Sequence, residues 1–257
     1  MLSAICGFMA SSFARALHMM VCNFVTIPDD ENLINLLSPL MTSTMVHLIS
    51  NLEDSMQKLR ILTLIGGISR KSLNQMLFSA IESSSHDDLY LETFDISTLP
   101  YFSQDLELDL PFSVRDFKEK IRESDAVLFV TPEYNHSIPG VLKNAIDWGS
   151  RPYGQNVWNK KPAAIMGASI SVMGTINAQN HLRQILAYLN MRVMTQPEFL
   201  YHSTNSLDRD GNMNDDKGRL HLEKFLNSFV EWVDYMGEKN LPALGLQDSA
   251  HLHFSLS

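Results

Sequence analysis

Short apolar segments alternate with amphipathic segments along most of this chain, and this alternation limits the fold more than any other feature. Residues 126–130 (AVLFV) and 162–166 (PAAIM) are wholly apolar, as expected for strands that are covered on both faces of a sheet. The amphipathic segments between them have the length of connecting helices, about 10–15 residues. We therefore predict a parallel sheet with helices on both faces.

The same pattern predicts five strand–helix units. The strands are expected at 59–65, 89–95, 126–130, 162–166 and 191–195, and the helices at 72–83, 113–124, 139–148, 178–189 and 216–235. Right-handed crossovers reduce the topologies open to such a chain, and the units fit the flavodoxin-like strand order 2-1-3-4-5. The predicted fold class is an α/β, three-layer flavodoxin-like sandwich around a five-stranded parallel sheet.

The beginning of the chain differs from the rest in composition. The first 55 residues are rich in Met, Ser and Leu and contain both cysteines, but Arg15 is their only basic residue other than histidine. A secretory signal or a transit peptide would carry more positive charge. We interpret 1–55 as an extension that is poorly ordered or reflects a mis-assigned start, 56–240 as the flavodoxin-like domain and 241–257 as a tail. A cytoplasmic location is predicted.

Charge and composition exclude several classes of protein. The net charge is −9 and no run of lysine and arginine occurs. The chain therefore lacks the cluster of basic residues that nucleic-acid-binding proteins usually carry, and no nucleic-acid partner is predicted. No apolar stretch reaches the roughly 18 residues of a membrane-spanning helix, so no membrane contact is predicted. Two cysteines are too few for a disulfide scaffold or a thiolate zinc site, and we predict no metal.

The loop after the first predicted strand has the composition of a phosphate site. It reads GGISRKSLN over residues 66–74 and leads into a helix, whose amino end attracts anions. The glycines allow a tight turn with exposed N–H groups, and Arg70 and Lys71 add positive charge. Serine and asparagine also cap ordinary helices, so helix capping alone remains an alternative interpretation.

Two further loops follow the third and fourth predicted strands, at the end of the sheet where ligands bind in doubly wound folds. Residues 131–140 (TPEYNHSIPG) contain a tyrosine and a carboxylate, which would suit a flat ligand with a polar edge. Residues 167–174 (GASISVMG) are mostly small and would allow a ring to approach the backbone. Either loop could also be a simple connector, with Ser137 capping the next helix.

Residues 132–148 (PEYNHSIPGVLKNAIDW) closely resemble the signature of the NADPH-dependent FMN reductase family, which includes quinone, chromate and azo-dye reductases. Residues 66–74 are similar to the family's G-S-x-R-x-x-S-x-N phosphate loop, and 168–184 to its third loop and the helix after it. The resemblance covers 59–236. It implies an FMN-dependent enzyme that passes hydride from NADPH or NADH through the flavin to a small-molecule acceptor such as a quinone or free flavin. It also implies a homodimer or homotetramer.

The resemblance further implies which residues hold FMN. The phosphate would be bound by Gly67, Ser69, Arg70, Ser72 and Asn74. One side of the flavin would be lined by Pro132, Glu133, Tyr134, Asn135 and Ser137. The pyrimidine end would be approached by Gly167, Ser169 and Gly174. No catalytic side chain is expected, because in such enzymes the cofactor carries the reaction.

The chain departs from the family pattern in two loops. Gly67 and Ser69 stand where the family has Ser and Arg, and Ile170, Ser171 and Thr175 stand where Pro or Gly is usual. A flavodoxin-type electron carrier without NAD(P)H turnover, and a degenerate family member that serves as an interaction protein, are the alternatives. A hydrolase is disfavoured because G-x-S-x-G is incomplete around Ser169, and a Rossmann dehydrogenase because no G-x-G-x-x-G occurs.

Overall fold

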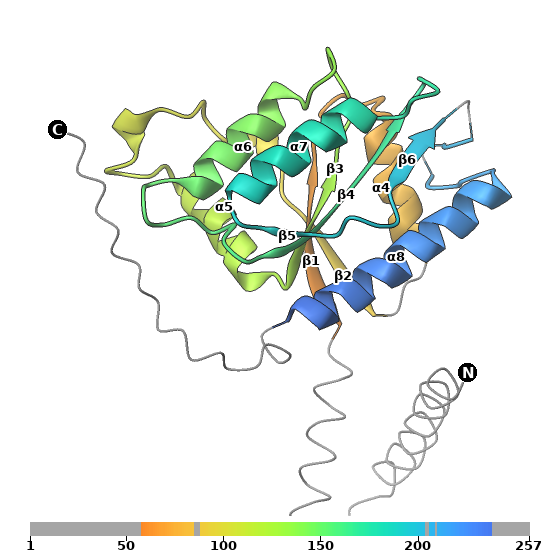
Figure 1. Cartoon of the computed structure of the whole chain (residues 1–257). Coiled ribbons are helices and arrows are strands. Elements are labelled where there is room, and N and C mark those ends of the chain that lie inside the picture. The colour runs from red at the N-terminus through yellow and green to blue at the C-terminus, as the bar shows by residue number, and fades with distance from the viewer. Residues whose placement is uncertain (1–57, 85–87, 204–205, 209, 238–257) are drawn as a thin grey trace, which may run out of the picture. The chain divides into compact units, whose positions relative to one another are not determined.

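The computed structural model describes residues 58–84, 88–203, 206–208 and 210–237. The predicted extension 1–55 and the predicted tail 241–257 lie outside the described residues. Within the described part, strands and helices alternate along the chain as the hydrophobic pattern predicts (Figure 1).

The strands of the described residues belong to one parallel sheet, in the order β2-β1-β3-β4-β5 with β6 also paired to β4. Their bounds are β1 Leu59–Ile65, β2 Leu89–Thr93, β3 Ala126–Val130, β4 Pro162–Ser169, β5 Arg192–Val193 and β6 Phe199–His202. The order confirms the predicted 2-1-3-4-5 topology and the α/β flavodoxin-like fold class. Ile65 lies opposite Val130, and Val130 opposite Met166, so the loops that follow β1, β3 and β4 leave the sheet along the same edge.

One edge of the sheet differs from the prediction. The fifth strand was expected over 191–195, but β5 pairs with β4 only at Arg192 and Val193. The chain then leaves the sheet and returns as β6, which pairs with β4 from Met166 to Ser169. The segment FLYH of β6 is short, and its alternating burial is too brief a pattern to be recognised in the sequence.

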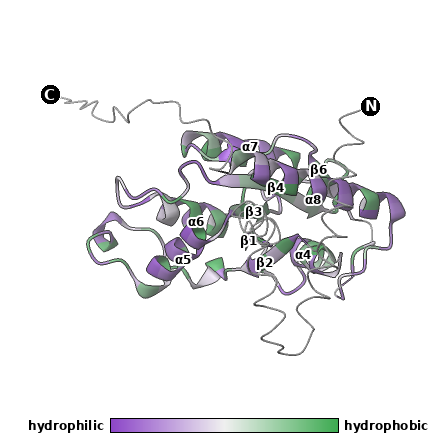
Figure 2. Ribbon diagram, turned by 90° about the horizontal axis from the view of Figure 1, so that it is seen from below, coloured by the Kyte–Doolittle hydropathy of each residue, from purple (hydrophilic) through white to green (hydrophobic). Residues whose placement is uncertain are grey.

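The helices form two layers. Their bounds are α4 Leu73–Ser83, α5 Phe112–Glu123, α6 Gly140–Ser150, α7 Ile176–Tyr188 and α8 Asp216–Met236. Two short 3-10 turns, η2 Ile96–Thr98 and η3 Gln104–Leu106, lie between β2 and α5. Side chains of α4 and α8 pack with Ile61 and Leu128 on one face of the sheet. Those of α5, α6 and α7 pack with Leu62 and Phe129 on the other face. The helices carry hydrophobic and hydrophilic residues in alternation (Figure 2), as helices that lie on a sheet do.

The described residues contain neither a candidate membrane span nor a candidate metal site. No helix in this part of the chain is both long enough and apolar enough to cross a membrane. The same residues contain no group of three or more His, Cys, Asp or Glu side chains that could hold a metal ion.

Candidate functional site

The three segments predicted as loops lie side by side at the carboxyl ends of β1, β3 and β4. The third differs from the prediction, because Gly167, Ala168 and Ser169 belong to β4, which is extended by pairing with β6. The Gly66 N–H donates to the Val130 carbonyl and the Thr131 N–H to the Met166 carbonyl, each at 2.9 Å. A β-carbon on Gly66 would lie 3.3 Å from the ring of Pro132, which is buried. The doubly wound topology therefore brings together residues that are far apart in the sequence.

The first loop presents positive charge at the beginning of α4. Ser72 caps this helix, because its Oγ accepts from the Asn74 N–H at 3.2 Å. Ser69, Arg70 and Lys71 are exposed immediately before the cap, and the first turn of α4 contains no acidic residue. A helix amino end and two exposed cationic side chains together make a site that suits an anion.

Asn74 has a different position from its neighbours in this loop. Its side chain is buried, and its amide exchanges two hydrogen bonds with the backbone of Ala168, both at 3.0 Å. Asn74 therefore joins the first turn of α4 to the end of β4. This contact holds the first loop to the segment that contains Ala168, although the two residues are 94 positions apart in the sequence.

Two of the predicted glycines lie where a side chain would collide with a neighbour. A β-carbon on Gly67 would be 2.1 Å from Ser72 Oγ, the group that caps α4. A β-carbon on Gly167 would be 2.3 Å from both the Thr131 carbonyl and Thr175 Oγ1. Gly67 therefore leaves room for the cap of α4 within the first loop, and Gly167 allows close approach of the backbone at Thr131 in the second.

The second loop is a tight hairpin. Tyr134 and Ser137 exchange two backbone hydrogen bonds at 3.0 Å. Between them, Asn135 and His136 have φ angles of 52° and 59°, which is the left-handed conformation of a type I′ turn. The hairpin exposes 53 % of Tyr134, so the ring is available to a ligand.

Glu133, at the base of this hairpin, contacts the amino end of α7. Its carboxylate accepts from the N–H of Asn177 at 2.9 Å, from the side-chain amide of Asn177 at 2.9 Å and from the N–H of Ala178 at 3.0 Å. Burial by itself raises the pKa of Glu133, but these hydrogen bonds outweigh it and lower the pKa below its ordinary value. Glu133 is therefore held as a carboxylate.

Two residues of α7 complete this contact, and the sequence analysis assigned neither to the site. The side-chain amide of Asn177 lies 2.8 Å from Nδ1 of the exposed His136. His181, one turn further along α7, lies with its Nδ1 2.7 Å from Ser137 Oγ. Asn177 and His181 stand four positions apart, so they share one face of the helix. That spacing was the only signal in the sequence, and by itself it does not indicate what the face contacts.

The third loop is fixed at its ends and exposed in its middle. Gly174 has a φ of +60°, and a β-carbon there would lie 3.1 Å from Leu200. Ser169 accepts from the Ser171 N–H through Oγ at 3.0 Å and from the Ser203 N–H through its carbonyl at 2.9 Å. Between these ends the most exposed apolar side chains are Ile170, Val172 and Met173.

These features fit FMN. The first loop offers a cationic helix amino end without acidic neighbours, which a phosphate requires. Apolar side chains from all three loops are exposed around it: Ile68, Tyr134, Ile170, Val172 and Met173. Binding sites for flat ligands combine such apolar surface with a few fixed polar groups.

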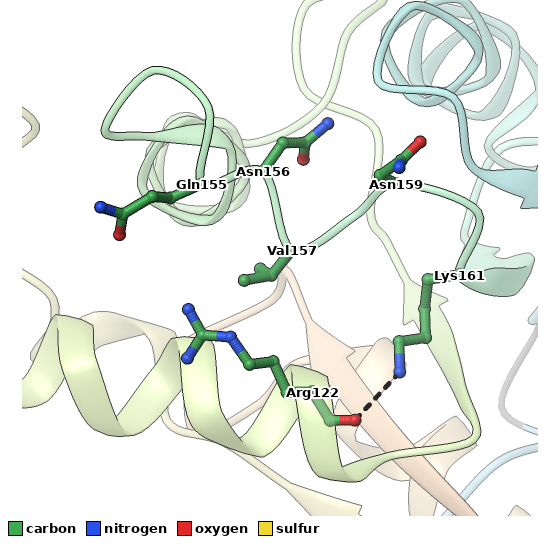
Figure 3. Close-up of a pocket in the computed structure, with 6 residues that line it drawn as sticks. All are labelled: Arg122, Gln155, Asn156, Val157, Asn159 and Lys161. Atoms are coloured by element: carbon green, nitrogen blue, oxygen red, sulfur yellow. Dashed lines mark hydrogen bonds between the residues drawn. The ribbon is translucent and has the colours of Figure 1, made fainter. Parts of the chain in front are cut away.

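The hollow shown in Figure 3 lies elsewhere. It is lined by Arg122, Gln155, Asn156, Val157, Asn159 and Lys161. Lys161 immediately precedes β4 and donates to the Arg122 carbonyl at 3.3 Å. The hollow is therefore at the amino ends of the strands, opposite the three loops, and it contains none of the residues that the sequence analysis assigned to a ligand.

Comparison with known proteins identifies the family. Residues 59–206 match the NADPH-dependent FMN reductase family. The chain is 44 % identical to a 2-hydroxy-1,4-benzoquinone reductase of Burkholderia over 176 residues, which cover 68 % of this chain and 96 % of that protein. It is 41 % identical to a quinone reductase of Pseudomonas putida, with 66 % of this chain and 91 % of that protein covered.

A solved structure agrees with the sequence relatives. The flavoenzyme NAD(P)H:(acceptor) oxidoreductase FerB of Paracoccus denitrificans superposes with a TM-score of 0.67 at 38 % identity, and the match covers 69 % of this chain and 98 % of that one. The chain belongs to the NADPH-dependent FMN reductase family and is an FMN-dependent oxidoreductase that uses NAD(P)H as its electron donor.

Proposed function

We propose that the three loops form the FMN site and that the enzyme reduces quinones. The observation that carries the site is the first loop, where Ser69, Arg70 and Lys71 are exposed before the cap of α4. Gly67 and Ser72 complete the turn that would hold the phosphate. Asn74 supports this loop through its two hydrogen bonds to the backbone of Ala168, and we assign it this role rather than contact with the ligand.

The second and third loops would hold the ring system. Pro132, Tyr134 and Asn135 form one side, and Gly167 and Ser169 form the end from which backbone groups approach the pyrimidine ring. FMN, when bound, accepts hydride from NAD(P)H and delivers electrons to an acceptor. The protein binds and orients both substrates in turn, and the exposed Ile170, Val172 and Met173 provide an apolar surface that excludes water from a flat acceptor.

A quinone is the proposed acceptor because it is flat and apolar, as this surface requires, and because the named relatives from Burkholderia and Pseudomonas reduce quinones.

We further propose that residues 56–240 suffice for the reaction, that the enzyme works in the cytoplasm, and that it is a homodimer or homotetramer. Light scattering of the purified protein measures the last of these directly.

Anaerobic titration tests the function. The purified protein should take up added FMN, lose its visible flavin absorbance on addition of NADPH or NADH, and recover it when a benzoquinone is added. Protein that fails to bind FMN would refute the site. Protein that binds FMN but is not reduced by either nucleotide would be a flavodoxin-type carrier. Reduction by NAD(P)H without reoxidation by quinones would refute the proposed acceptor.

A further inference from the structure

The amino end of α7 lacks a cap from its own segment. Thr175 occupies the capping position, but its side chain makes no capping hydrogen bond. The first N–H groups of a helix need an acceptor and attract negative charge. Here the acceptor comes from the second loop, where the Glu133 carboxylate accepts from the N–H groups of both Asn177 and Ala178.

The contact extends beyond one carboxylate. The Asn177 side chain donates to Glu133 at 2.9 Å and lies 2.8 Å from His136. Ser137 and His181 form a second point of attachment at 2.7 Å. The hairpin is thus attached to α7 on both sides of its turn. We refer to Glu133, His136 and Asn177 as the α7 clamp.

The hairpin needs this support. Asn135 and His136 both have positive φ angles, and a left-handed conformation is unfavourable for residues other than glycine, least so for Asn. Such a conformation persists only where the surroundings determine it. The His136 side chain lies 2.8 Å from the Asn177 amide, while Tyr134 beside it in the hairpin is exposed.

The clamp also connects two of the ligand loops. α7 begins directly after the third loop, so any residue that fixes the hairpin to Asn177 fixes the second loop against the third. Glu133 is only 14 % exposed in its side chain, and its carboxylate is engaged by three donors of α7 and lies 3.3 Å from Nδ1 of His136.

We propose that Glu133 is a positioning residue, which neutralises the amino end of α7 and thereby sets the spacing between the two loops that enclose the flavin ring. This inference rests on the proposed site. It predicts that removal of the charge loosens both loops together in the protein without FMN, and weakens FMN binding as a result.

The variant Glu133→Gln keeps the size of the side chain but places an NH₂ group among three donors. Without these charge-assisted hydrogen bonds the two loops are looser before FMN binds, and FMN binding is weakened as a result. The loss corresponds to roughly tenfold to hundredfold weaker binding of FMN. We expect the FMN dissociation constant, measured by quenching of FMN fluorescence, to rise by that factor. Hydrogen exchange of the FMN-free protein should become faster in 131–140 and at the first turn of α7, and remain unchanged in β2.

A helix cap elsewhere provides the matched control. Asp215 caps α8 and accepts from the Lys217 N–H at 3.1 Å. Asp215→Ala should lower the melting temperature by an amount similar to that for Glu133→Gln, but leave the affinity for FMN unchanged. If both variants weaken FMN binding equally, the effect of Glu133 is on global stability and the proposal is wrong.

An exchanged pair separates positioning from simple loss of a residue. Asn177→Asp places a second carboxylate opposite that of Glu133. It should weaken FMN binding at least as much as Glu133→Gln does. The double variant Glu133→Gln with Asn177→Asp restores an amide–carboxylate pair, and it should bind FMN more tightly than Asn177→Asp alone. Unchanged affinity in Glu133→Gln, or no recovery in the double variant, would overturn the proposal. Because hydrogen exchange is measured without FMN, a wild-type protein that does not bind FMN would refute the site but not the clamp.

Discussion

Lys118 permits a stability prediction whose sign follows from its surroundings. This residue of α5 is 1 % exposed, and its Nζ donates to the carbonyl oxygens of Trp148, Gly149, Arg151 and Gln155. The first two belong to the end of α6, where the helix dipole favours a cation. The other two belong to the loop that follows, so one ammonium group holds α5, α6 and that loop together.

The pKa of Lys118 is lowered from its ordinary 10.5 to about 8, mainly by burial and also by the nearby charge of Arg122, while Glu107 opposes the change. Below pH 8 both the folded and the unfolded chain are protonated, and folding carries the full cost of the buried charge. Between pH 8 and 10.5 the folded protein releases a proton that the unfolded chain retains, so the free energy of unfolding rises with pH. From pH 7 to 9.5 this contribution amounts to about 2 kcal/mol.

The variant Lys118→Met lacks this titration and has a similar length. Urea unfolding of both proteins at pH 7, 8, 9 and 9.5 should show wild type gaining about 2 kcal/mol relative to the variant over the range. Lys224→Met, which replaces an exposed lysine of α8, reports any general effect of losing a positive charge. Wild type that gains no stability relative to Lys118→Met as the pH rises would contradict the prediction. It would show that the four carbonyl oxygens keep Lys118 protonated in the folded protein despite its burial.

Two other substitutions test the packing around the site. Asn74→Ala removes both hydrogen bonds to Ala168 and should lower the free energy of unfolding by about 2–3 kcal/mol; a loss below about 0.5 kcal/mol in urea titrations would contradict the bracing role. Gly149→Ala places a β-carbon 2.3 Å from the buried Trp158 ring and should cost at least about 1–3 kcal/mol, seen as a lower melting temperature. Gly140→Ala, whose β-carbon meets nothing within 4 Å, should melt like wild type, and equal losses in both variants would rule out the steric explanation.

Much of the fold could be predicted because its causes are local. Apolar strands such as 126–130 reveal themselves by composition, and the connecting helices by periodicity. The crossover rule then orders the strands and places the three loops at one edge. The sheet edge could not be predicted, because β5 and β6 are two and four residues long and depend on pairing with β4 rather than on a pattern of their own.

Within the site, sequence motifs indicated which loops meet but not what each side chain does there. Asn74 and Glu133 were both expected at the ligand. In the structure Asn74 bonds to Ala168, 94 residues away, and Glu133 to Asn177, 44 residues away, which motif spacing does not indicate.

The sequence by itself determined the order of the sheet, the segments at the carboxyl ends of its strands and the family, since each is indicated by residues that are close together along the chain. Only the tertiary structure decided which polar groups remain available to a ligand. A buried amide or carboxylate bonds to whichever donors and acceptors the fold brings within about 3 Å of it, and that distance depends on the packing of separate elements. In this chain, Asn74 and Glu133 bond to residues of other elements, while Ser69, Arg70 and Tyr134 are exposed at the proposed site.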